Sequence, residues 1–212
     1  MNMEKRKQKL IEIGRRMVDR NLTSGTGGNI SFYDQSNDVV WITPTGYDFY
    51  SIELVDLVGI DLTGKIIAGE LKPTSEWHMH VEVYKYRQDV KAVIHGHTVY
   101  ATALSLLREP LTATHYMVAL AGKNVPIAEY ATFGTLELAV NAVKAMGMKN
   151  AVLLANHGVN AVGSSLEHAF AVLEQVEYCS RLQLIARSAG QPIVIEDAEM
   201  NRIIEKFKSY GQ

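Results

Sequence analysis

The sequence predicts a single α/β domain in which a central mixed or antiparallel β-sheet is covered by helices on both faces. Apolar runs typical of strands alternate with amphipathic segments typical of helices. Two pairs of short strands are separated by tight turns, which favours hairpins over a purely parallel sheet. No internal repeat, linker or shift in composition divides the 212 residues. We therefore expect one domain over residues 1–212.

The first half of the chain predicts one helix followed by two hairpins. Leu10, Ile13 and Met17 recur at helical spacing among charged residues, so residues 4–21 should form an amphipathic helix. Three glycines within residues 23–29 then interrupt the chain. The expected strand pairs are 30–33 with 39–43 and 57–61 with 65–69, separated by a loop at 43–53 that leads into a short helix.

The second half alternates helices and strands. Thr74 and Ser75 are candidate caps for a helix that continues to residue 88, with Glu76 in its first turn. Gly147 and Gly190 should close two later helices. The other expected strands are 90–97, 125–130, 150–158 and 159–162, and the other expected helices are 98–107, 135–147, 165–190 and 196–208.

Composition indicates a protein without a nucleic-acid or membrane-binding surface. The formal net charge is −2, from 21 basic and 23 acidic residues, with no long run of one sign. The basic N-terminus lacks the continuous apolar core of a signal peptide, and no apolar stretch approaches the ~20 residues that span a bilayer. The single cysteine, Cys179, lies in an amphipathic segment and suits a reducing compartment as a buried thiol. We expect a cytoplasmic protein.

Two histidines near the end of an apolar strand raise the hypothesis of a metal site. In VIHGHTVYATA (93–103), His95 and His97 are two residues apart, so both side chains project from the same face of the strand. Taken alone, this pair favours packing or hydrogen-bonding roles over metal binding. His157 ends a second apolar run, AVLLANHG, and two such strands can converge at one edge of a sheet. A catalytic zinc commonly takes three protein ligands and leaves one position open.

Three further histidines and one glutamate are the remaining candidates. His78 and His80 point about 200° apart on the predicted helix and cannot both face one site. His168 is expected at a core or surface position of the long helix. Glu76 is the natural carboxylate candidate, but without further context a glutamate stabilised by the helix dipole is the more common role at such a position.

Three segments are suited to binding an anion through neutral donors. GTGGN (25–29), TPTG (43–46) and TSE (74–76) offer glycine amides, hydroxyl groups and a helix N-terminus. None matches the P-loop or the dinucleotide-binding glycine pattern, and each alone is an ordinary turn. Together they suggest a small phosphorylated substrate.

These segments also carry a resemblance to a known family. TSGTGGNIS, ITPTGY, KPTSEWHMH, AVIHGHTVYATALS, THYMVALAG, EYATFGT, LLANHGV and EKFKSYG are similar, in this order and nearly end to end, to the class II aldolase and epimerase family, which shares its fold with adducin head domains. The HYM…AG, YATFGT and EKFKSYG segments resemble in particular the branch that acts on L-fuculose 1-phosphate.

The resemblance implies a role for each matching residue. The implied metal ligands, for one zinc ion per subunit, are Glu76, His95, His97 and His157. The implied phosphate-binding residues are Gly28, Asn29, Thr45, Gly46, Thr74 and Ser75, where Thr74 departs mildly from the family pattern but keeps its hydroxyl. Tyr116 matches a tyrosine that reaches across the subunit interface of a homotetramer and protonates the leaving aldehyde, and Phe133 and Tyr210 match residues that shape the aldehyde side.

The implied reaction is the reversible cleavage of L-fuculose 1-phosphate to dihydroxyacetone phosphate and L-lactaldehyde. A zinc ion bound by the C2 carbonyl and C3 hydroxyl oxygens would be a Lewis acid where negative charge develops. Glu76 would move a proton on and off C3 of dihydroxyacetone phosphate. No Schiff-base lysine is needed.

Other activities share this scaffold and stay open to different degrees. L-ribulose-5-phosphate 4-epimerases carry an additional aspartate near the aldehyde site that residues 114–134 lack, and rhamnulose-1-phosphate aldolases are usually longer. A methylthioribulose-1-phosphate dehydratase is not excluded by the metal ligands. A non-catalytic adducin-like module is disfavoured by the complete ligand set. HGHT lacks the following Asp-His of metallo-β-lactamases, and no His-Glu-x-x-His is present.

Overall fold

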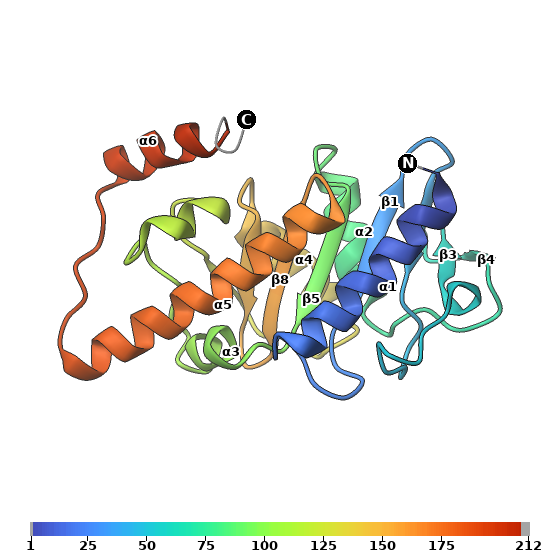
Figure 1. Cartoon of the computed structure of the whole chain (residues 1–212), viewed down its shortest axis with the longest axis horizontal. Coiled ribbons are helices and arrows are strands. Elements are labelled where there is room, and N and C mark those ends of the chain that lie inside the picture. The colour runs from blue at the N-terminus through green and yellow to red at the C-terminus, as the bar shows by residue number, and fades with distance from the viewer. Residues whose placement is uncertain (1, 209–212) are drawn as a thin grey trace.

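The computed structural model describes residues 2–208, which form an eight-stranded sheet with helices on both faces (Figure 1). The α-helices are α1 (Met3–Asp19), α2 (Trp77–Tyr86), α3 (Val99–Leu106), α4 (Leu136–Met146), α5 (Leu166–Ala189) and α6 (Asp197–Phe207), with 3₁₀ helices η1 (Leu54–Asp56) and η2 (Tyr116–Leu120). The strands are β1 (Asn29–Asp34), β2 (Val39–Ile42), β3 (Val58–Ile60), β4 (Ile66–Ala68), β5 (Ala92–Gly96), β6 (Ile127–Ala128), β7 (Ala151–Leu154) and β8 (Gly158–Gly163).

The sheet is mixed, as predicted. Its strand order is β4-β3-β2-β1-β5-β8-β7-β6, and every neighbouring pair is antiparallel except β6 and β7. The two expected hairpins, β1–β2 and β3–β4, are both present. In the centre, β5 pairs with β1 on one side and with β8 on the other.

Two hydrophobic cores form because alternate side chains of each strand point to opposite faces of the sheet. Ile94 of β5 packs in a core with α1, α3 and α5, whereas its neighbour Val93 packs in the other core with α2 and α4. In Figure 1, α1 and α5 cross the face of the sheet turned toward the viewer, and α2 and α4 lie behind it. The prediction of helices on both faces is therefore confirmed.

Some element boundaries differ from the sequence prediction. The strand expected at 125–130 shrinks to the two residues Ile127–Ala128 at the sheet edge, where Pro126 lacks an N–H for the ladder. His157 lies in the turn between β7 and β8 rather than at the end of a strand. Gly147 and Gly190 close α4 and α5 as expected.

The N-terminus of α2 also differs, and this difference affects the site. The helix begins at Trp77, so Glu76 occupies the N-cap position instead of the first turn and makes no capping hydrogen bond with its side chain. The prediction that Thr74 and Ser75 cap this helix is therefore wrong, although the Thr74 hydroxyl accepts from the Glu76 N–H at 3.3 Å. Within residues 2–208, no helix combines the length and apolar character required to cross a bilayer.

Candidate metal centre

Four side chains predicted as metal ligands converge on one point. The donor atoms of Glu76, His95, His97 and His157 all lie within 4.8 Å of one another. The Nε2 atoms of His95 and His97 are 3.0 Å apart. The two carboxylate oxygens of Glu76 lie 3.3 Å from His95 Nε2 and 3.3 Å from His157 Nε2. The carboxylate thus faces the histidines instead of its own helix.

The central strands of the sheet bring these residues together. His95 is on β5, and His97 follows that strand directly. Gly96 pairs with Val159 of β8, so the turn that carries His157 lies beside the end of β5. Glu76 reaches the same point from the N-terminus of α2.

The local interactions leave these donor atoms available to a cation. His95 Nδ1 lies 3.0 Å from the Val159 carbonyl, which fixes the proton on Nδ1 and leaves the Nε2 lone pair facing the centre. Glu76 Oε1 is buried and, among residues 2–208, has no hydrogen-bond partner. Burial, reinforced by the neighbouring His157 and His97, holds the pKa of His95 well below its ordinary value, so its imidazole is neutral. Three imidazoles and one carboxylate fit a divalent transition metal such as zinc.

Glycines keep the backbone close around this centre. A Cβ on Gly158 would lie 2.6 Å from the Gly96 carbonyl oxygen and 3.0 Å from His97 Cδ2. A Cβ on Gly28 would lie 2.7 Å from the His95 carbonyl oxygen, and Gly28 has φ +77°, which favours glycine. The strands at the centre can pack this closely only because both positions lack a side chain.

The segments predicted to bind phosphate lie next to one another and next to the metal centre. The Thr74 N–H donates to the Thr43 carbonyl at 3.0 Å, and the Thr45 N–H donates to the Lys72 carbonyl at 3.1 Å. Asn29 of β1 donates from Nδ2 to Glu76 Oε2 at 2.9 Å, which places the third segment at the same site. Gly46 has φ +73° and open space around its Cα.

A cavity of about 320 Å³ opens directly onto the metal centre. Its lining residues are Ser75, Glu76, His97, Tyr130, Ala131, Phe133, Asn156 and His157. Phe133, predicted on the aldehyde side, therefore lies at the cavity, where it is 67% exposed. Tyr130 and Asn156 were not predicted as site residues, although each lies within a segment that carries the family resemblance, EYATFGT and LLANHGV.

Of the two predicted tyrosines, only Tyr116 is among the described residues, and it lies away from this cavity. Tyr116 begins η2, is 49% exposed, stacks on Phe207 of α6, and does not line this cavity. Tyr210 falls outside the described residues 2–208. His80, to which sequence reasoning assigned no role, is fully buried and contacts Asn29. His78 stacks on Trp77.

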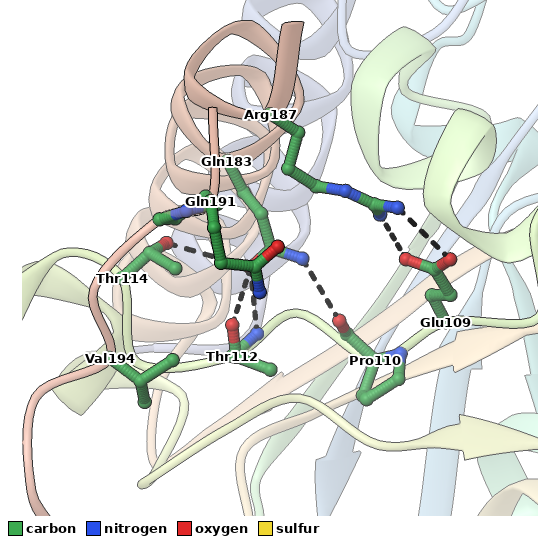
Figure 2. Close-up of a pocket in the computed structure, with 9 residues that line it drawn as sticks. Glu109, Pro110, Thr112, Thr114, Gln183, Arg187, Gln191 and Val194 are labelled. Carbon is green, nitrogen blue, oxygen red and sulfur yellow. Dashed lines mark hydrogen bonds and ion pairs between the residues drawn. The ribbon is translucent and has the colours of Figure 1, made fainter. Parts of the chain in front are cut away.

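A second cavity, of about 240 Å³, lies between the end of α5, with the segment after it, and the loop that follows α3 (Figure 2). The Gln183 side chain there bonds to Thr112 and to the Pro110 carbonyl, and Arg187 forms an ion pair with Glu109. Its polar side chains are largely engaged with one another, and the cavity holds none of the convergent histidines. The metal centre is therefore the candidate active site.

The fold and the centre define the class of protein. Residues 8–184 match the family described as Class II Aldolase and Adducin N-terminal domain, and the chain belongs to this family. Its relatives are aldolases, so the chain is an aldolase, a lyase of a metal-dependent class, and its four converging side chains form a group that could hold the metal ion.

Individual relatives share nearly the whole chain. The sequence is 39% identical over 212 residues to 5-deoxy-D-ribulose 1-phosphate aldolase of Bacillus thuringiensis, covering 100% of both chains. It is 39% identical over 213 residues to L-fuculose phosphate aldolase of Escherichia coli, covering 100% of this chain and 98% of the relative. The structure resembles a solved L-fuculose 1-phosphate aldolase with a TM-score of 0.96 and 50% identity, covering 98% of each chain.

Proposed function

We propose that this protein is a zinc-dependent aldolase that cleaves L-fuculose 1-phosphate reversibly to dihydroxyacetone phosphate and L-lactaldehyde. The observation that supports this choice of substrate is the similarity to a solved L-fuculose 1-phosphate aldolase, which is 50% identical and covers 98% of the chain. The supporting geometry is a cluster of neutral donors beside the metal centre, which suits a phosphate ester, and a cavity of about 320 Å³, which suits a small sugar.

The chain's own residues bind and orient the substrate. Gly28, Asn29, Thr45, Gly46, Thr74 and Ser75 form the proposed phosphate site. Because these donors are uncharged, they hold the phosphate through hydrogen bonds and leave the positive charge of the centre for the reacting end of the sugar. A bound zinc ion supplies Lewis-acid stabilisation of the negative charge that develops when the C3–C4 bond breaks.

Glu76 is the proposed acid and base at C3. Its carboxylate is buried at the base of the cavity, within contact of two ligand histidines. In the cleavage direction it returns a proton to C3 of the three-carbon fragment, and in the condensation direction it removes that proton.

The aldehyde side is proposed to need a second subunit. Tyr116 is exposed and does not line the cavity at the metal centre of its own subunit. This arrangement fits a homotetramer in which the partner subunit's Tyr116 exchanges a proton with the aldehyde oxygen. Phe133 and Tyr210 would shape the aldehyde pocket. We place this activity in the cytoplasm.

A second candidate substrate is 5-deoxy-D-ribulose 1-phosphate, favoured by the Bacillus thuringiensis relative that is matched over its full length. It shares the first three carbons and the phosphate and would release acetaldehyde. The two substrates therefore differ only at the aldehyde side.

The zinc-loaded protein should be incubated with L-fuculose 1-phosphate, 5-deoxy-D-ribulose 1-phosphate, L-rhamnulose 1-phosphate and L-ribulose 5-phosphate. Dihydroxyacetone phosphate is followed by NADH oxidation with glycerol-3-phosphate dehydrogenase. We expect kcat/KM to be highest for L-fuculose 1-phosphate. A higher kcat/KM for 5-deoxy-D-ribulose 1-phosphate would overturn L-fuculose 1-phosphate as the substrate and favour the deoxypentulose. Formation of an epimer from L-ribulose 5-phosphate without cleavage would overturn the aldolase assignment.

The shared site is tested by mixing two inactive variants, Glu76→Gln and Tyr116→Phe. In randomly mixed tetramers, about a quarter of the sites combine an intact Glu76 with an intact Tyr116 of the partner subunit, so activity should return. If the mixture stays as inactive as its components, Tyr116 does not act across the interface.

A further inference from the structure

Behind Glu76, a continuous line of buried polar side chains leads away from the cavity. Asn29 Nδ2 donates to Glu76 Oε2 at 2.9 Å, and Asn29 Oδ1 lies 2.5 Å from His80 Nε2. His80 Nδ1 lies 2.7 Å from Ser31 Oγ, which in turn lies 2.7 Å from the Tyr84 hydroxyl. Asn29, Ser31, His80 and Tyr84 are each at most 3% exposed.

Two elements build this line by their periodicity. Asn29 and Ser31 are two residues apart on β1, so both point to the face of the sheet that α2 covers. His80 and Tyr84 are four residues apart on α2 and lie on the same side of that helix. The helix side chains thus alternate with the strand side chains along one line.

The hydrogen bonds of this line all have one direction. A carboxylate only accepts, so Asn29 turns its NH₂ group to Glu76 and its carbonyl oxygen to His80. That oxygen requires a proton on His80 Nε2, which leaves Nδ1 as an acceptor for the Ser31 hydroxyl. Ser31 then accepts from Tyr84. Each group donates toward Glu76, and a proton on His80 Nδ1 instead of Nε2 would remove the donor to Asn29 Oδ1 and the acceptor for Ser31.

We propose that His80, held by Ser31 and Tyr84, is a positioning residue that locks the Asn29 amide and through it the orientation of the Glu76 carboxylate. The proposal rests on the acid and base role proposed for Glu76. Burial also lowers the pKa of His80 to about 3, so the ring stays neutral with one donor and one acceptor nitrogen. A buried polar line of this kind is favourable only when every member is satisfied, which makes its geometry rigid.

The first test reads the tautomer directly and needs neither substrate nor activity. In ¹⁵N-histidine-labelled protein, long-range ¹H–¹⁵N correlation spectra should show His80 protonated on Nε2, with and without zinc. The His80 resonances are assigned by their loss in the His80→Gln variant. Ser31→Ala should shift the His80 Nδ1 resonance. Tyr33→Phe should leave it unchanged, because the Tyr33 hydroxyl donates to Asp38 outside this line. A proton on His80 Nδ1 would overturn the proposal.

The second test compares His80→Gln with His80→Met, two side chains of similar length. Gln can still donate to Asn29 Oδ1, whereas Met cannot. We expect kcat of His80→Met to fall at least about tenfold with little change in KM, and that of His80→Gln to stay much closer to the wild-type value. Zinc affinity, measured against a chromogenic chelator, should be similar in the two variants because the three ligand histidines are unchanged. Equal kcat in the two variants would overturn the proposal.

The two proposals can fail separately. A wild-type protein that cleaves none of the ketose phosphates would overturn the proposed function, while the histidine spectra would still decide whether His80 holds Asn29. Conversely, an active aldolase with His80 protonated on Nδ1 would retain the proposed function and lose the positioning role.

Discussion

Replacing Gly158 by alanine should disable the metal centre without touching a ligand. Gly158 is the first residue of β8, directly after His157. Its φ lies outside the left-handed region, so alanine can adopt its backbone conformation and the effect is purely steric. The new Cβ would lie 2.6 Å from the Gly96 carbonyl oxygen and 3.0 Å from His97 Cδ2.

The size of the effect follows from these distances. Ordinary contact at a Cβ begins at 3.4 Å, so the ends of β5 and β8 would have to separate by about 0.8 Å. Metal–ligand distances hold within about ±0.2 Å, so a shift of that size between His97 and His157 cannot be absorbed by the centre. We expect zinc affinity to fall at least about tenfold. Overpacking should also lower the free energy of unfolding of the metal-free protein by about 1–3 kcal/mol.

Gly190→Ala is the matched control. Gly190 has φ 164°, an extended conformation open to any residue, and no atom of the described part of the chain lies within 4 Å of a Cβ built there. Zinc affinity should be measured by competition with a chromogenic chelator, and stability by thermal unfolding with excess chelator. If Gly158→Ala binds zinc as tightly as Gly190→Ala, the close approach of β5 and β8 does not hold the metal ligands in place.

Three further outcomes follow from the structure. Glu76→Gln keeps three histidine ligands and should retain zinc by elemental analysis, yet lose at least about 100-fold in kcat; normal turnover would show that Glu76 is not the acid and base. Removing the metal with a chelator should lower the melting temperature, since metal at a hundredfold excess over its Kd stabilises the folded state by about 2.7 kcal/mol; an unchanged melting temperature would contradict a site formed by folding. Cys179 is fully buried, and burial raises the pKa of its thiol to about 12, so iodoacetamide at pH 8 should label it only after unfolding; rapid labelling of the folded protein would refute this burial.

Most of the fold follows from local patterns because its elements are strongly periodic. The hairpins and the amphipathic helices bury one face each, and that requirement is visible in short windows of sequence. The strand at 125–130 was overestimated for a physical reason. It lies at the sheet edge and contains Pro126, so only Ile127 and Ala128 join the sheet by pairing with β7, whereas Val125 forms an isolated bridge with Leu111.

The site was less accessible to local reasoning. The spacing of His95 and His97 predicted that they share a face, and the structure confirms their convergence. Glu76 gave no such signal, because the residue that turns its carboxylate away from α2 is Asn29, 47 positions earlier. Sequence reasoning assigned no role to His80 beyond stating that His78 and His80 cannot both face one site, because its partners Asn29 and Ser31 belong to β1. Sequence reasoning named Glu76 as the natural carboxylate candidate, and the family resemblance then assigned it to the metal ligands before the structure placed it beside the histidines.

The register of the central strands connects the fold to the chemistry. His95 pairs with Asn29 on one side and with Asn160 on the other, and this register directs the His95 imidazole to the face where α2 presents Glu76. If β5 slipped by one residue relative to β1 and β8, the His95 side chain would point into the opposite core, because side chains alternate with a period of two. The apolar neighbours Val93 and Ile94 oppose such a slip, since each is fully buried in its own core. The hydrophobic pattern of β5 therefore fixes the position of the metal ligand as well as the packing of the sheet.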